Sequence, residues 1–189
     1  MVQAASKLMT FQEFLAWQPE TGRFELHDGV IVEMQPTGPH VREASPKEKQ
    51  VVGLLNRKLN VLIDQADLEA FIPNTALIRP SDAESGYKPD ILLIDQPSLA
   101  QEPLWERESR ESIVTLGTSI KLVVEVTSTN WPDDYARKFE DYEAMGIAEY
   151  WIVDYQGLGG RRYIGSPKQP TVTICQLVKG LYQTQLFRR

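Results

Sequence analysis

The sequence predicts a mixed α/β protein, and three features support this class. Short apolar runs of strand length fill the second half of the chain. A segment with helical periodicity, about residues 132–145, separates two of these runs and predicts a strand–helix–strand unit with parallel strands. An Asp-Gly pair at 28–29 between two apolar runs is typical of a β-hairpin. The 189 residues show no repeat and no break in composition, so we expect a single domain over 1–189.

The N-terminal third predicts a helix, a hairpin and a second, longer helix. Thr10 stands before the segment 11–17 and Glu13 follows three residues later, which is the capping-box pattern of a helix start. The hairpin is expected to pair 23–26 with 30–34, so that helix and hairpin together cover about 8–34. Apolar residues at helical spacing then predict a helix from about 45 to 64, and Pro46 suits its first turn.

The rest of the chain predicts a sheet. Strands are expected at 70–72, 76–78, 91–94, 122–126, 150–153, 172–177 and 181–186. The last two form a C-terminal β-hairpin of about 170–187, and the others belong to a core of about 40–155. The polar stretch 96–117 is expected to be a long connection with a helical turn. Cys175, the only cysteine, lies in an alternating apolar run and is expected to be a buried strand residue, not a nucleophile.

The charge balance excludes one class of function. The chain has 20 basic and 26 acidic side chains, a net charge of -6, whereas proteins that coat nucleic acid usually carry a strong basic excess. The charge balance does not exclude a protein that contacts a polyanion only at a local site, through a metal ion. No signal peptide and no apolar run long enough to span a bilayer is recognisable, so we expect a cytoplasmic protein without a membrane partner.

Two acidic residues at strand positions are the main candidates for chemistry. Glu125 interrupts the apolar run 122–126, where a buried carboxylate is unfavourable unless a cation or hydrogen bonds compensate it. Asp90 follows Pro89 at the start of the strand 91–94. Two carboxylates at neighbouring strand ends suit a hard divalent cation such as Mg²⁺. The simpler alternatives are an ion pair between Glu125 and an arginine, and a turn role for Asp90.

A lysine on the following helix is the third candidate. Lys138 lies at the border of the apolar stripe of the helix 132–145. It is expected to lean toward Asp90 and Glu125, where it could orient or deprotonate a water and stabilise charge on a phosphate. The alternative is a solvated i,i+4 ion pair with Asp134, which contributes only a few tenths of a kcal/mol.

These residues belong to a series of short motifs whose order and spacing resemble the Uma-two family of putative restriction endonucleases, a branch of the PD-(D/E)xK nuclease superfamily. The motifs are 24–29 (FELHDG), 38–40 (GPH), 89–90 (PD), 124–128 (VEVTS), 134–138 (DYARK), Tyr142, Gly146 and 149–154 (EYWIVD). The resemblance covers about residues 8–155. It implies a restriction-endonuclease-like core, with a central mixed β-sheet flanked by helices.

The resemblance also implies a set of site residues. Asp90 and Glu125 would be catalytic ligands of Mg²⁺ or Mn²⁺, and Glu25 a third carboxylate at the metal. The lysine of the superfamily usually stands two residues after the second carboxylate, and here Thr127 occupies that position. Lys138 is the expected catalytic substitute.

Lys88, His40 and Trp131 are further candidates for contacts to a substrate. Lys88, beside Pro89, is a weaker candidate for the missing lysine and for a substrate contact. His40 could contact a phosphate or simply shape its loop. Trp131 could stack on a base or pack under its loop. His27, in the hairpin turn, is expected to be solvated.

The expected function is a Mg²⁺-dependent endonuclease that hydrolyses DNA phosphodiester bonds, with double-stranded DNA as its partner and a metal-activated water as nucleophile. Restriction-type enzymes often dimerise to cut both strands, so a homodimer is a further expectation. One alternative is a degenerate nuclease fold that acts as a nucleic-acid-binding or protein-interaction module, which Thr127 and the acidic balance favour. Another is a structural homodimer without a nucleic-acid role.

Overall fold

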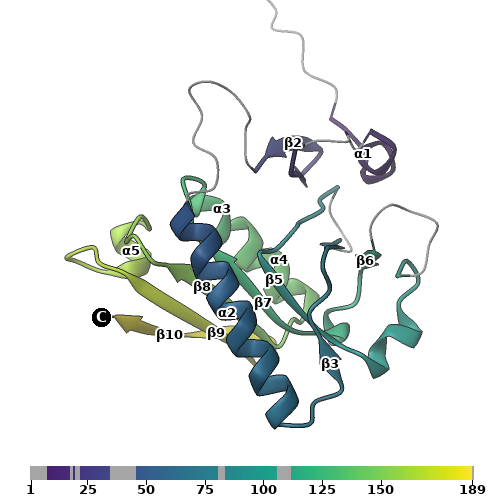
Figure 1. Ribbon diagram of the computed structural model, residues 1–189. Coiled ribbons are helices and arrows are strands. Elements are labelled where there is room, and N and C mark those ends of the chain that lie inside the picture. The colour runs from purple at the N-terminus through teal and green to yellow at the C-terminus, as the bar shows by residue number, and fades with distance from the viewer. Residues whose placement is uncertain are drawn as a thin grey trace, which may run out of the picture.

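A six-stranded mixed sheet with flanking helices forms the centre of the protein (Figure 1). The computed structural model describes residues 8–17, 19, 22–34, 46–80, 84–105 and 112–188. The strand order of the central sheet is β10-β9-β8-β7-β5-β3. The predicted α/β class with a mixed central sheet is therefore confirmed.

The central sheet joins strands from residue 70 to the C-terminal region. Its members are β3 (Ala70–Phe71), β5 (Ile91–Asp95), β7 (Ile120–Val126), β8 (Glu149–Asp154), β9 (Thr171–Val178) and β10 (Leu181–Arg188). β7 and β8 pair in parallel, as the strand–helix–strand prediction requires, and the other neighbours are antiparallel. Each of the seven predicted strands of this half is present, with its ends within two residues of the prediction.

Two small sheets lie outside the central one. β1 (Phe24–His27) pairs with β2 (Val30–Glu33) as the predicted hairpin, and β4 (Ala76–Ile78) pairs in parallel with β6 (Ser112–Val114). The sequence did not predict β6, because three residues in a polar connection make no recognisable pattern and their partner is distant in the chain. The same connection contains two 3₁₀-helices, η1 (Pro97–Gln101) and η2 (Gly117–Ser119).

The α-helices among the described residues are α1 (Phe11–Trp17), α2 (Pro46–Gln65), α3 (Trp131–Tyr135), α4 (Arg137–Met145) and α5 (Arg161–Ile164). The single helix predicted over 132–145 is instead two helices, because Ala136 leaves the helical region with φ −122° and ψ −78°. α4 ends at Gly146, whose φ of 78° is the left-handed conformation that glycine accepts without strain.

Helices cover both faces of the central sheet, with α2 on one side and α4 on the other (Figure 1). Leu59 and Ile63 of α2 pack in one core cluster with Val124 of β7, whereas Tyr142 of α4 packs in another cluster with Val123. Successive strand residues point to opposite faces. β7 therefore directs Glu125, the residue after Val124, toward α4.

The N-terminal helix and hairpin rest on a third core cluster, which joins Phe11, Phe14 and Leu26 to β4 and β6. The predicted capping box is present: the Thr10 N–H donates to Glu13 Oε2 at 2.8 Å, and the Glu13 N–H donates to Thr10 Oγ1 at 3.2 Å. The hairpin turns at the predicted Asp-Gly pair, with positive φ at both residues as a type I′ turn requires.

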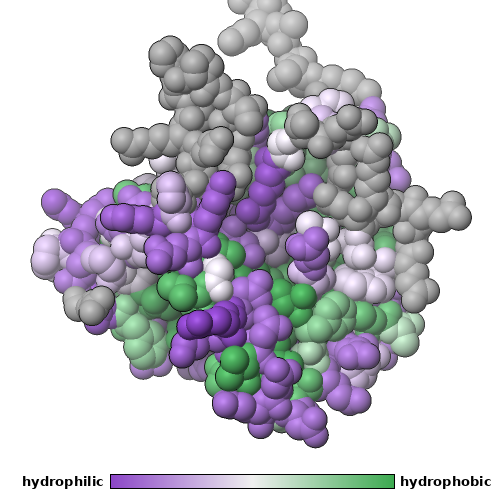
Figure 2. All heavy atoms as spheres, in the orientation of Figure 1, coloured by the Kyte–Doolittle hydropathy of each residue, from purple (hydrophilic) through white to green (hydrophobic). Residues whose placement is uncertain are grey.

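The surface around α2 mixes hydrophilic and hydrophobic residues (Figure 2). α2 buries Leu59 and Ile63, while its Leu54, Val61 and Leu62 are about half exposed. Within the described part of the chain, no helix is long and apolar enough to cross a bilayer. On the sheet, Cys175 of β9 is fully buried, as predicted, and burial raises the pKa of its thiol to about 12.

Candidate active site

Asp90 and Glu125 stand at adjacent ends of β5 and β7. Ile91 pairs with Val124 in this antiparallel ladder, so Asp90, one residue before Ile91, lies opposite Glu125. Both carboxylates are shielded from solvent, with 11% of the Asp90 side chain and 4% of the Glu125 side chain exposed. The fold thus brings together the two residues that the sequence singled out.

The Asp90 carboxylate is held on both of its oxygens. Oδ2 accepts the N–H of Val126 at 2.8 Å, which links the start of β5 to the end of β7. Oδ1 pairs with the guanidinium of Arg23 at 2.9 Å, and Arg23 also donates to the carbonyl of Lys88. Asp90 therefore does more than shape a turn, because it bridges two strands and a cation.

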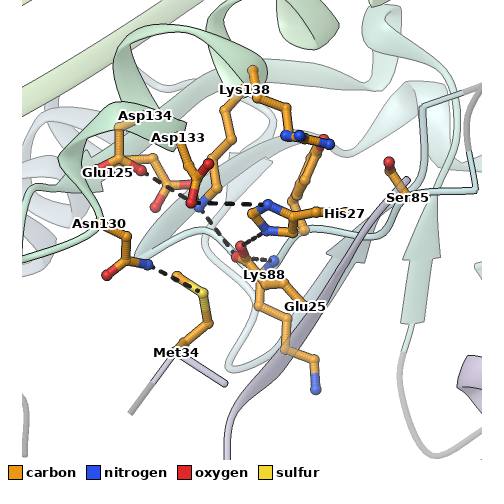
Figure 3. Close-up of polar contacts among 12 residues, drawn as sticks. Glu25, His27, Met34, Ser85, Lys88, Glu125, Asn130, Asp133, Asp134 and Lys138 are labelled. Carbon is orange, nitrogen blue, oxygen red and sulfur yellow. Dashed lines mark hydrogen bonds and ion pairs between the residues drawn. The ribbon is translucent and has the colours of Figure 1, made fainter. Parts of the chain in front are cut away.

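Lys138 extends from α4 into the space between two carboxylates (Figure 3). Its Nζ lies 3.0 Å from Glu125 Oε1, 3.2 Å from Glu25 Oε1 and 3.6 Å from Asp134 Oδ1. The lysine side chain is fully buried. The interpretation of a solvated Asp134–Lys138 pair is therefore wrong, because this face of α4 is turned toward the sheet.

The expectation that Lys138 leans toward the strand carboxylates agrees with this geometry, and Glu125 pairs with a lysine rather than an arginine. Glu125 Oε1 also accepts a hydrogen bond from the Tyr142 hydroxyl at 3.2 Å. Tyr142 lies one turn after Lys138 on α4, so a single helix supplies both donors to this oxygen.

Glu25 reaches the same lysine from the N-terminal hairpin. Its Oε1 accepts the Lys88 N–H at 2.8 Å, and its Oε2 lies 2.8 Å from His27 Nε2. His27 is 4% exposed, so the expectation of a solvated histidine is wrong. The cause is tertiary: α3 covers the hairpin here, with Asp133 Oδ2 4.0 Å from His27 Nδ1.

Burial and the charges at the site shift the pKa values of its carboxyl groups in opposite directions. Burial raises the pKa of Glu125 well above its usual range, and the nearby Asp134, Asp90 and Glu25 raise it further against the effect of Lys138. Burial likewise raises the pKa of Asp134 to about 7. In contrast, burial disfavours the Glu25 anion, but Lys138 and His27 outweigh it and lower the Glu25 pKa to about 2.

Lys138 stays charged in this environment. Burial alone would lower the pKa of its ammonium, but the charges of Glu125, Glu25 and Asp134 outweigh burial and raise that pKa well above its usual value. The cluster of Glu25, Asp90, Glu125 and Asp134 thus faces the two cations Lys138 and Arg23. If all four carboxylates ionise, the described cluster carries an excess of negative charge.

A small pocket with a volume of about 20 Å³, enough for a water molecule, opens beside this cluster. Its lining consists of Arg23, Met34, Glu48, Asp90, Glu125, Val126, Ser128, Asn130 and Asp134. Asp90, Glu125 and Asp134 thus present carboxylates to one small space. Lys138 is not among the described lining residues but contacts Glu125 and Asp134.

The donor set suits a divalent cation. Mg²⁺ and Mn²⁺ prefer carboxylate oxygens. A double positive charge would favour the ionised forms of Glu125 and Asp134, whose pKa values are raised by burial and by the neighbouring carboxylates. In the arrangement shown by the described residues, no three His, Cys, Asp or Glu side chains are placed to hold a metal together. Instead, Glu125 and Glu25 are turned toward Lys138, and Asp90 toward Arg23.

The remaining candidates take other positions. Lys88 contributes its backbone N–H to Glu25, and its side chain extends away from the carboxylate cluster in Figure 3. Trp131 packs against Tyr135 and Tyr163, with ring centroids 6.4 and 6.3 Å apart, as its packing alternative predicts. His40 lies outside the described residues.

Thr127 occupies the position of the superfamily lysine and is fully buried. Its hydroxyl oxygen has no hydrogen-bond partner among the described residues. A hydroxyl at this position carries no charge, so the positive charge of the cluster comes from α4 and from Arg23 instead.

Sequence reasoning missed the roles of Arg23 and Asp134. The sequence pattern indicates Arg23 only as the first residue of a strand, and nothing local links it to Asp90, 67 positions away. Asp134 was noted only as the partner of Lys138. Its position one helical turn before Lys138 was the available signal, since two residues at this spacing share a helix face.

The central mixed sheet flanked by helices is consistent with a restriction-endonuclease-like fold. The family model of Uma2, "Putative restriction endonuclease", matches residues 11–189, nearly the whole chain. The chain therefore belongs to the Uma2 family. The resemblance in its motifs is confirmed, and the match extends through the C-terminal hairpin. A search among curated proteins found no match.

Proposed function

We propose that this protein is a divalent-cation-dependent endonuclease that hydrolyses phosphodiester bonds of double-stranded DNA. The family supports a nuclease in general terms. One observation carries the finer proposal: Asp90 and Glu125 from adjacent strands line one pocket, and the buried Lys138 contacts Glu125 directly. This combination of two carboxylates and a lysine suits the hydrolysis of a phosphodiester.

Asp90 and Glu125 would hold Mg²⁺ or Mn²⁺. The bound cation would lower the pKa of a water and neutralise charge on the phosphate. Lys138 adds a fixed positive charge beside Glu125, where it stabilises negative charge that develops on the phosphoryl oxygens. Arg23, which lines the same pocket and is only partly buried, would contact a DNA phosphate.

A second function is favoured by the burial of Lys138. In the described structure this lysine is saturated by three carboxylates and has no exposed surface. Thr127 also stands at the usual lysine position. A protein with this arrangement could bind nucleic acid, or another protein, without cleaving DNA.

A nicking assay on supercoiled plasmid in Mg²⁺, Mn²⁺ or EDTA distinguishes the two functions. The variants are Asp90→Asn, Glu125→Gln and Lys138→Met, with Glu140→Gln on the exposed face of α4 as the matched control. The proposal expects nicking that needs a cation, is lost in the three site variants and persists in the control. Loss of at least about a hundredfold is expected for each site variant, since each removes a charged group from the reacting centre.

Two further measurements complete the test. Calorimetry with Mn²⁺ should give binding to the native chain and none to Asp90→Asn or Glu125→Gln. Purified protein that binds DNA in a salt-dependent manner but nicks in neither metal would overturn the enzyme and favour the binding module. Sedimentation with and without DNA reports whether a homodimer forms.

A further inference from the structure

The two faces of strand β1 contact different parts of the protein. Leu26 is fully buried in the core cluster beneath α1, and Phe24 packs on the same cluster. Glu25 and His27 alternate with them and point the other way, toward α3 and α4 (Figure 3). Both are buried, at 0% and 4% exposure, although a hairpin next to the protein surface would normally keep such residues in water.

The hairpin is attached to the α3–α4 segment at three successive points. Glu25 pairs with Lys138, and His27 Nδ1 lies 4.0 Å from Asp133. Asp28 at the turn pairs with Arg137. Because these contacts come from both helices flanking Ala136, the hairpin sets the position of the helix that carries Lys138.

Both oxygens of Glu25 are directed at donors of the protein itself. Oε1 accepts the Lys88 N–H at 2.8 Å and contacts Lys138 Nζ at 3.2 Å. Oε2 lies 2.8 Å from His27 Nε2. The His27 ring is itself held, since it meets Tyr87 edge-on with centroids 5.1 Å apart.

Glu25 is also absent from the described residues that line the pocket beside Asp90 and Glu125. A carboxylate that ligates a cation must reach the space that the cation occupies. Asp90 and Glu125 line the pocket, whereas Glu25 is directed at the Lys88 N–H, Lys138 and His27. The family resemblance would place Glu25 at the metal, whereas the contacts place it behind the lysine.

We propose that Glu25, held in place by His27, is the positioning residue for Lys138 and is not a ligand of the cation. This inference deepens the proposed nuclease function and rests on it. The lysine side chain has four rotatable bonds, and Glu25 and Glu125 approach its ammonium from two different elements. Without Glu25, the ammonium keeps only Glu125 and Asp134, both of which line the pocket, and it is drawn toward them.

The test separates cation affinity from turnover. Glu25→Gln keeps the size of the side chain but removes its charge, and Glu140→Gln on exposed α4 is the matched control. Calorimetry without DNA should give Mn²⁺ affinity within about twofold of the native chain. The single-turnover rate constant of cleavage should be about 10- to 100-fold lower, the range typical when a supporting residue is removed. In a separate steady-state experiment, the KM for DNA should change little. A tenfold or greater loss of Mn²⁺ affinity, as for a true ligand, would overturn the proposal.

His27 supplies a second test in case Glu25→Gln does not fold. His27→Gln keeps a hydrogen-bond donor for Glu25, and His27→Ala removes it. Cleavage should fall in His27→Ala and recover at least in part in His27→Gln, while Mn²⁺ affinity stays unchanged in both. Equal activity of the two variants would contradict the role of His27.

A readout independent of activity distinguishes failure of this inference from failure of the nuclease function. Lys138 in the native chain should resist acylation by acetic anhydride, as mapped by mass spectrometry, because its amine is buried and charged. In Glu25→Gln its labelling should rise at least about tenfold, since one of its three ion-pair partners is gone. If native protein never nicks DNA, this increase and unchanged Mn²⁺ affinity still support the positioning role. Unchanged labelling would refute it.

Discussion

Asp134 should make the cation-free protein less stable as the pH rises toward neutrality. The residue is 7% exposed, and burial raises the pKa of its carboxyl from 3.8 to about 7. In the unfolded chain the group titrates near its ordinary value. The difference in pKa corresponds to ~4 kcal/mol of differential interaction between the two protonation states.

The direction follows from proton binding. Between the two pKa values the folded state holds a proton at Asp134 that the unfolded state has lost, so the free energy of unfolding falls as the pH rises. Below the unfolded pKa the penalty is absent, and above about 7 it is complete. Asp134→Asn removes the titration and keeps the shape of the side chain. The pKa of about 7 already includes the attraction between Asp134 and Lys138, so the loss of this attraction in the variant adds no separate contribution.

Urea unfolding followed by tryptophan fluorescence, in EDTA and across a pH series, measures this effect. The stability difference between Asp134→Asn and the native chain should move in favour of the variant by ~3 kcal/mol between about pH 4.5 and pH 8. Glu140→Gln should run parallel to the native chain. Parallel curves for Asp134→Asn, within about 1 kcal/mol, would refute the electrostatic reasoning.

Three other predictions test separate features. Lys138→Met removes the cation shared by three buried carboxylates, so stability at pH 8 should fall by about 3–5 kcal/mol. The loss should be smaller at pH 5, where Asp134 and Glu125 are more protonated, and urea midpoints that shift equally at both pH values would contradict this. Gly117→Ala brings a methyl group against the backbone carbonyl of Met145 and should lower the free energy of unfolding by ~1–3 kcal/mol. An unchanged melting temperature would contradict this and show that the backbone shifts to make room for the methyl group. Cys175 is fully buried, so iodoacetamide should label it in the native protein at least about a hundredfold more slowly than in urea, and rapid native labelling would contradict the packing of β9.

Local patterns predicted most of the secondary structure. The capping box at Thr10 and the Asp-Gly turn act through neighbours a few residues away, and both are present where expected. The central strands follow from short apolar runs, because a strand buried on both faces has few polar positions. The short strand β6 was not predicted because its partner β4 lies far away in the chain. The break at Ala136 was not predicted because the helical spacing of apolar residues continues across it.

The candidate site was predicted in part. Glu125 and Asp90 were recognisable because a carboxylate in an apolar strand, or at its entrance, needs a partner. Lys138 was found through the family resemblance and the helix that carries it. His27 was misjudged as solvated because its burial comes from α3, which begins more than one hundred residues later.

The α/β class, the positions of the strands and the choice of Asp90, Glu125 and Lys138 follow from burial patterns and motif spacing, which are local properties of the chain. How these groups are paired depends on the folded arrangement of the elements. Folding places the Lys138 ammonium between Glu125 and Glu25, directs Arg23 to Asp90, and buries Lys138 with its two glutamates. The physical reason is that electrostatic energy depends on distance and on exclusion from water, and both are set by elements that meet only when the chain is folded.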